Sequence, residues 1–122
     1  MTKIVLWVSD LEAQIGFYSR LFDVDAPSAS GGFAEVAGGG NSVLLHKLPD
    51  EYSAATPLSK QLSVQDEVAI KPVFTVDSIS AAQQRTAGTF ASFAATKNAY
   101  GEFEYQDAVD PEGNVIQLQQ KL

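Results

Sequence analysis

The chain opens with a stretch rich in β-branched and apolar residues, which is typical of a buried strand, and then changes to a helical period. Residues 3–8 form a predicted strand whose two faces comprise Ile4, Leu6 and Val8 on one side and Lys3, Val5 and Trp7 on the other. Burying an unpaired ammonium is costly, so the aliphatic face is expected to pack under the next helix and the face with Lys3 to stay open. Ser9 and Glu12 have the spacing of a capping box, which predicts that this helix begins after Ser9. Its buried positions recur at helical spacing in Leu11, Ile15, Tyr18, Leu21 and Phe22.

The remaining elements repeat this order. Strands are predicted at 32–37 and 42–47 around a glycine-rich turn, with a further short strand at 23–29. A long connection at 49–67 follows, and then a strand at 71–76, a helix at 78–86 and strands at 89–94, 102–109 and 114–119. Lys3 and Lys71 have the same place in the two halves, as do Val5 and Val73. Strands with one helix in each half predict an α+β domain built from a repeated unit.

Composition narrows the class of protein. The 122 residues carry a net charge of -7 and 45% hydrophobic residues, which is typical of one globular domain. We expect a single domain over 1–122, with a first module at about 1–48, a linker at about 49–67 and a second module at about 68–122. No basic run is present to bind nucleic acid, and the absence of Cys excludes disulfides and thiolate sites. Without a signal sequence or a long apolar segment, we expect a cytoplasmic protein with no membrane partner.

Three stretches, in order, cover almost the whole chain. They are Val5–Leu11 followed by Phe17-Tyr18 and Leu21-Phe22, Val73–Asp77 leading to Ala87-Gly88, and Tyr100-Gly101 with Asp110–Leu118. The set resembles the vicinal oxygen chelate superfamily, which includes glyoxalase I, extradiol dioxygenases, fosfomycin-resistance enzymes and bleomycin-binding proteins. The resemblance implies two βαβββ modules whose mixed sheets curl around a cavity, with the helices on the outside.

The resemblance also implies where metal ligands would be. In metal-dependent members, four ligands project from cavity-facing strands, and these positions map onto Lys3, Leu44, Lys71 and Gln117. A leucine cannot ligate, and a protonated ammonium has no lone pair. Gln117 alone keeps a ligand-capable side chain, and one amide oxygen does not hold a divalent cation. The sequence therefore predicts no metal and no cofactor, as in the bleomycin-resistance-like branch of the superfamily.

Candidate ligand-binding residues come from the cavity-facing positions and their neighbours. They are Lys3, Trp7, Phe33, Glu35, Leu44, His46, Lys71, Phe103, Tyr105 and Gln117. If both lysines face the cavity, they could hold an anionic group or pair with Glu35 and other carboxylates. Four of the ten residues have an ordinary alternative: the lysines can extend to water, Trp7 can belong to the core, and His46 can face solvent at a strand end. No residue is assigned a catalytic role, because His46 is the only histidine and no nucleophile–His–acid arrangement is suggested.

These residues favour binding without catalysis. The leading hypothesis is a homodimer that holds a small organic molecule, aromatic or cationic, with antibiotic sequestration as one form of this function. The alternative is a metal-dependent lyase or dioxygenase with rearranged ligands. A third hypothesis is a scaffold or regulatory protein whose cavity is filled by its own side chains.

Overall fold

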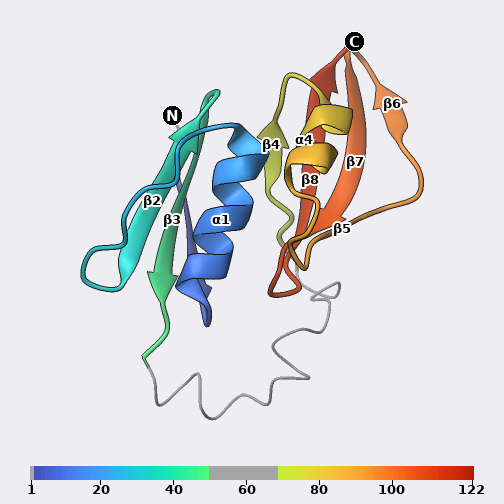
Figure 1. Ribbon diagram of the computed structural model, residues 1–122. Helices are drawn as coiled ribbons and strands as arrows, with labels where there is room; N and C mark the ends of the chain where they lie inside the picture. Colours follow the sequence, from blue (N-terminus) through green and yellow to red (C-terminus); the bar gives the residue numbers. More distant parts are fainter. Residues whose placement is uncertain (1, 50–68) are drawn as a thin grey trace.

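The computed structural model describes residues 2–49 and 69–122. In chain order, these residues form β1 (Ile4–Val8), α1 (Leu11–Phe22), β2 (Phe33–Gly38), β3 (Asn41–Lys47), β4 (Val73–Thr75), α4 (Ile79–Arg85), β5 (Ser92–Phe93), β6 (Asn98–Tyr100), β7 (Phe103–Val109) and β8 (Val115–Lys121). The strands make two mixed sheets, ordered β1-β3-β2 and β4-β8-β7-β5, with β6 also paired to β7. The fold is α+β, with one helix beside each sheet (Figure 1). The predicted linker at about 49–67 lies outside the described residues except for Pro49.

The pairing of the strands shows the repeat residue by residue. β3 runs parallel to β1 and antiparallel to β2, just as β8 runs parallel to β4 and antiparallel to β7. Equivalent cross-strand rows in the two halves are Val5–Leu44–Glu35 and Val73–Gln117–Asp107. The two halves thus place residues in equivalent positions although few of the side chains are identical.

The described strands differ from a strict repeat of four-stranded modules. Residues 23–29, expected as a strand, form none, and only one isolated bridge joins Ser30 to Phe33. Pro27 lacks a ladder donor, and Gly31 and Gly32 turn the chain with φ values of 63° and 82°. In the second half the strand expected at 89–94 shortens to β5, and β6 adds a strand that the sequence pattern did not predict.

The N-terminus of α1 corrects the capping prediction by one residue. Asp10, and not Ser9, is the N-cap, and its Oδ1 accepts a hydrogen bond from the Ala13 N–H at 3.0 Å. In a capping box the Ser9 N–H would donate a hydrogen bond to the Glu12 side chain. Here it donates instead to Glu112 Oε1 at 2.8 Å. A side chain from the far end of the chain therefore replaces the local partner.

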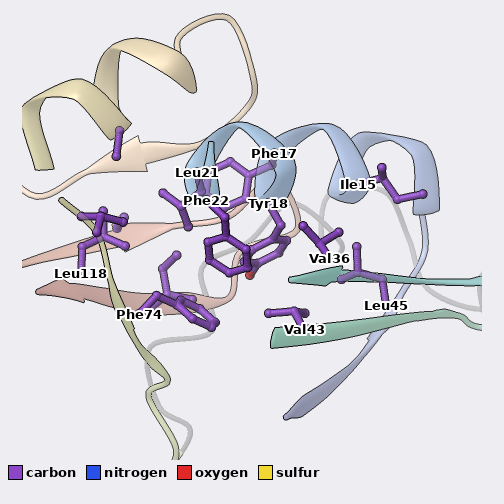
Figure 2. Close-up of a cluster of buried hydrophobic side chains, with 14 of the residues drawn as sticks. Ile15, Phe17, Tyr18, Leu21, Phe22, Val36, Val43, Leu45, Phe74 and Leu118 are labelled. Carbon is purple, nitrogen blue, oxygen red and sulfur yellow. The ribbon is translucent and has the colours of Figure 1, made fainter. Parts of the chain in front are cut away.

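The core lies between the helices and the sheets. Figure 2 shows Tyr18 and Phe22 of α1 between Phe74 on one side and the aliphatic side chains of β2 and β3 on the other. The predicted alternation of β1 is confirmed, because Val8 is fully buried and Ile4 and Leu6 pack against the core. Each sheet thus packs one face under the helices and leaves the other face open.

The turn at 110–114 attaches the second half to α1. Asp110 is 1% exposed, and its Oδ2 accepts hydrogen bonds from the Tyr18 hydroxyl at 2.7 Å and from Gln14 Nε2 at 3.2 Å. Glu112 accepts from the Ser9 and Asp10 N–H groups, while burial raises the pKa of its carboxyl. Hydrogen bonds across about a hundred residues of sequence, between the first helix and the last turn, hold the two halves as one unit.

Candidate functional site

The open face of the first sheet gathers six of the ten predicted residues. Alternation along β1, β2 and β3 turns these side chains away from the core: Lys3, Trp7, Phe33, Glu35, Leu44 and His46. Because the three strands are in register, these residues form rows across the sheet. The face changes from aromatic at one end to charged at the other.

The aromatic row consists of Trp7, His46 and Phe33. His46 is paired in register with Trp7 on one side and with Phe33 on the other. Its ring centroid lies 4.3 Å from that of Trp7 and 6.2 Å from that of Phe33. Trp7 is 56% exposed and Phe33 44% exposed, so the rings touch one another and still present free surface. Such a row can stack against a flat ligand.

The polar end of the same face is an ion pair between Lys3 and Glu35, and Ser42 forms a further hydrogen bond to Glu35. Lys3 Nζ donates to Glu35 Oε1 at 3.2 Å, and Ser42 Oγ donates to Glu35 Oε2 at 2.7 Å. The hydrogen bond from Ser42, and then that from Lys3, lowers the pKa of the Glu35 carboxyl. Glu35 is two residues from Phe33 along β2, or about 7 Å, so the ion pair and the aromatic row adjoin.

The second sheet carries the other four predicted residues on its own open face. Lys71 Nζ donates to Asp107 Oδ2 at 3.0 Å, and Gln117 Nε2 donates to Asp107 Oδ1 at 3.0 Å. This arrangement repeats the Lys3–Glu35 pair at the equivalent position. Phe103 and Tyr105 have ring centroids 6.3 Å apart.

The aromatic row itself is not repeated. The positions equivalent to Trp7 and His46 are Thr75 and Gln119, joined by a hydrogen bond of 2.8 Å from the amide to the hydroxyl. The open faces of the two sheets therefore share an ion pair but differ in what lies beside it. The first half alone has a stacking surface of three rings.

The ten residues fall into two groups, one on each sheet. In the described part of the chain, their side-chain hydrogen bonds and ion pairs stay within each half. Between the sheets lies an apolar hollow of about 250 Å³, lined by Ile4, Val5 and Leu6 of β1, by Ile70 and Pro72, and by residues 114–116. None of the ten predicted residues lines this hollow.

Two polar residues of these faces were missed by the sequence interpretation. Ser42 and Asp107 complete the ion-pair clusters. Asp107 has the place in the second half that Glu35 has in the first, so the internal repeat contained the signal. Nothing in the local pattern identifies Ser42 as a partner.

The four positions at which metal ligands were expected do not fit a divalent metal. Leu44 has no donor atom, and both lysines are engaged with carboxylates. The four oxygens of Glu35 and Asp107 each accept a hydrogen bond from a side chain of their own half. Among residues 2–49 and 69–122, no group of three or more His, Cys, Asp or Glu side chains is placed to hold a metal ion. The charged groups at these positions form two lysine–carboxylate ion pairs.

A family profile matches almost the entire chain. It is that of the Glyoxalase/Bleomycin resistance protein/Dioxygenase superfamily, and it matches residues 1–118. None of the curated proteins matches the sequence. No helix in the described part of the chain is long and apolar enough to cross a membrane.

Solved structures share the fold at low sequence identity. A glyoxalase/bleomycin resistance protein from Albidiferax ferrireducens is 14% identical with a TM-score of 0.70, over 100% of this chain and 98% of that chain. A glyoxalase/bleomycin resistance protein/dioxygenase family enzyme from Burkholderia phytofirmans is 18% identical with a TM-score of 0.68, over 98% and 97%. A fosfomycin resistance protein from Listeria monocytogenes, in complex with Mn(II) and a dihydroxypropylphosphonic acid, is 14% identical with a TM-score of 0.67, over 100% and 90%. Each of these similarities shows that the chain shares its fold with the solved structure.

Proposed function

Because the chain belongs to the glyoxalase/bleomycin resistance protein/dioxygenase superfamily, we propose that it binds a small organic molecule without metal and without catalysis. The observation that carries the proposal is the aromatic row of Trp7, His46 and Phe33, which lies open beside an ion pair. Binding needs a complementary surface with a few polar anchors, and this face has both. Chemistry of the metal-dependent kind would need free donor atoms, and the carboxylates here are already bonded.

The chemistry of this face favours a flat ligand with a polar group. An aromatic ring can stack on Trp7, where ring–ring contact adds to the burial of apolar area. Val5 and Leu44 separate the aromatic row from Lys3 and offer an apolar surface to the middle of the ligand. Glu35 can accept from a cationic or N–H group, and Lys3 can donate to an oxygen. Sequestration of an antibiotic, in a homodimer, is the form of this function that we propose.

The metal-dependent alternative takes its support from one neighbour in fold. The Listeria protein was solved with Mn(II), so the same fold accommodates a metal in that protein. The equivalent positions here hold two lysines, a leucine and a glutamine, and only the glutamine offers a metal-binding atom. The non-catalytic proposal is therefore the one the donor set supports.

The emission of Trp7, the only tryptophan, tests the proposal directly. Planar aromatic compounds that are cationic, neutral or anionic are screened for a rise in melting temperature, and each hit is titrated against Trp emission. We expect the emission to change on binding, and we expect Trp7→Ala to weaken binding by about 1–3 kcal/mol. Phe90→Ala is the control, because Phe90 is an 84% exposed ring outside this face. A hit that leaves both the emission and the affinity of Trp7→Ala unchanged would place the ligand elsewhere and refute the proposal.

A further inference from the structure

His46 lies at the centre of the aromatic row, between Trp7 of β1 and Phe33 of β2. Its side chain is partly buried, and its ring centroid lies 4.3 Å from that of Trp7. The row therefore contains two rings that are always neutral and one that is not, because the charge of an imidazole changes between about pH 5 and pH 8. His46 is also the only histidine of the chain, and Trp7 is the only tryptophan. The charge of the row thus depends on one side chain.

A hydrogen bond to the backbone determines where His46 takes up a proton. Its Nδ1 lies 3.3 Å from the carbonyl oxygen of Lys47, which can only accept, so Nδ1 carries the hydrogen. The lone pair of the neutral ring is then on Nε2. Among the described residues, no group forms a hydrogen bond with Nε2. A proton can therefore add at Nε2 without breaking a contact that the neutral ring makes.

A protonated His46 keeps its place in the row. A cation within about 6 Å of the centre of an aromatic ring is attracted by the electrons of the ring, most strongly by those of tryptophan. The His46 ring lies inside that range from Trp7, and it lies 6.2 Å from Phe33 with 23° between the two ring planes. The positive charge therefore stays on the open face, beside the surface on which a ligand would stack.

The other charged groups near the row keep their charge or face elsewhere. On β2, Glu35 is about 7 Å along the strand, and Lys3 of β1 is bonded to it. The hydrogen bond from Ser42, followed by that from Lys3, lowers the pKa of the Glu35 carboxyl, so this pair stays charged where an imidazole titrates. Lys47, the next residue of β3, lies on the opposite side of the strand by alternation. Glu112, which accepts from N–H groups just beyond β1, is the remaining group that can titrate nearby, because burial raises the pKa of its carboxyl.

We propose that His46 selects the ligand of this face by charge: the row binds a planar aromatic cation while His46 is neutral, and protonation of His46 releases that cation. Neutral His46 adds a third aromatic face to those of Trp7 and Phe33, and Glu35 supplies a negative charge at the polar end. A proton on His46 places a like charge against the bound cation. A planar anion has the opposite dependence on pH. This selection rests on the proposed ligand binding, to which it adds the charge of the ligand and the residue that controls its release.

The emission of Trp7 tests the contact in the protein without ligand. A protonated imidazole in contact with an indole quenches its fluorescence by accepting an electron from the excited ring. The emission should therefore fall as the pH is lowered from about 8 to about 5. His46→Phe keeps a ring in the row and cannot take up a proton, so the fall should disappear in this variant. A fall of equal size in His46→Phe comes from another group, such as Glu112, and overturns the proposal. An emission that stays constant in the unaltered chain overturns it as well.

Binding of two permanently charged planar compounds tests the selection itself. N-methylquinolinium is a cation and naphthalenesulfonate is an anion throughout this pH range, and calorimetry gives the dissociation constant Kd of each at both ends of it. We expect the Kd of the cation to rise about tenfold on acidification and that of the anion to fall, because charges in contact at a protein surface interact by about that factor. In His46→Phe and in His46→Gln, both Kd values should be independent of pH. Glutamine is the residue at the equivalent position of the second half, Gln119, so it suits this strand, and the melting temperature reports that each variant keeps the fold.

The possible results separate this selection from the proposed function. A cation that binds equally at both pH values, and whose binding Trp7→Ala still weakens, overturns the role of His46 and leaves the proposed ligand-binding face in place. A pH dependence that both His46 variants retain also overturns the role of His46. If N-methylquinolinium does not bind at about pH 8, the row does not take a planar cation, and the proposed selection fails whatever the wider ligand screen finds.

Discussion

At the scale of single residues, Asp110 has a structural role that the sequence pattern did not predict. The sequence shows it only as the first residue of a turn, and the structure shows a buried acceptor for Gln14, Tyr18 and Asn114. Tyr18 was predicted as one of the apolar positions of α1, and its ring does lie in the core. A phenol has both an apolar ring and a hydroxyl donor, so periodicity finds the first property and misses the second.

Removing the Tyr18 hydroxyl should weaken the fold. Tyr18→Phe keeps the ring and leaves Asp110 Oδ2 without its shortest hydrogen bond, so we expect a loss of about 1–3 kcal/mol in the free energy of unfolding. Urea denaturation measures this loss. Tyr100→Phe is the matched control, because Tyr100 is 81% exposed, and it should change stability little. Equal stability of the two variants would contradict the role of the Asp110 hydrogen bond.

The difference in stability between the unaltered chain and Tyr18→Phe should also depend on pH. Burial, with the charge of Asp110 next, raises the pKa of Tyr18 well above its ordinary value of 10.0. A raised pKa in the folded state means that this stability is complete below pH 10.0 and falls as the pH rises above it, because the unfolded chain then ionises first. The unaltered chain should therefore lose stability more steeply than Tyr18→Phe above that pH. Parallel curves for the two proteins would contradict the raised pKa.

At the scale of elements, alternation and helical periodicity predict the buried faces of strands and helices well. Turn chemistry predicts where the elements begin and end less well. The faces of β1 and the buried side of α1 follow from residue types alone, because burial depends on the side chain at each position. Three differences depend on turns and on pairing with distant strands: the missing strand at 23–29, the shortening of the strand expected at 89–94 to β5, and the additional strand β6. The cap of α1 failed for the same reason, since the partner of Ser9 is Glu112.

Two glycines with ordinary φ should respond to alanine in opposite ways. A Cβ at Gly16 meets open space, so Gly16→Ala should stabilise the monomer by about 0.5–1 kcal/mol through helix propensity. A Cβ at Gly38 would lie 2.5 Å from Val24 Cγ1, so Gly38→Ala should destabilise the fold by about 1–3 kcal/mol. Urea denaturation at low protein concentration measures both without dimer effects. The same sign for both variants would contradict this assignment of the two positions.

At the scale of the whole molecule, the sequence predicts which side chains share a face and not which of them meet. Alternation predicted that Phe33 shares a face with Glu35, Leu44 with His46, and Phe103 with Tyr105, and the burial patterns of β2, β3 and β7 agree. The sequence offered Glu35 and other carboxylates as partners for the two lysines, but it did not assign Glu35 to Lys3 and Asp107 to Lys71, because those contacts depend on strand register. The separation of the ten residues into two groups likewise depends on how two sheets meet, and no residue pattern encodes that directly.

The ion pairs of the two halves lead to a prediction about metal content. A metal site of the kind expected from the family draws ligands from both halves, and here each half has a lysine at such a position, bonded to a carboxylate. A divalent ion would have to displace a cation from Glu35 or Asp107 and would gain no nitrogen or sulfur ligand in return. We therefore expect protein purified without chelator to contain far less than one equivalent of Zn, Ni, Mn or Fe. We also expect the melting temperature to be unaffected by any of these ions or by chelator, because a ligand that binds only the folded state would raise it.

The double variant with Lys3→Ala and Lys71→Ala is the matched comparison. It frees both carboxylates, so weak stabilisation by metal is expected to appear. About one equivalent of metal in the unaltered chain, with loss of stability on its removal, would contradict the prediction and favour the metal-dependent alternative.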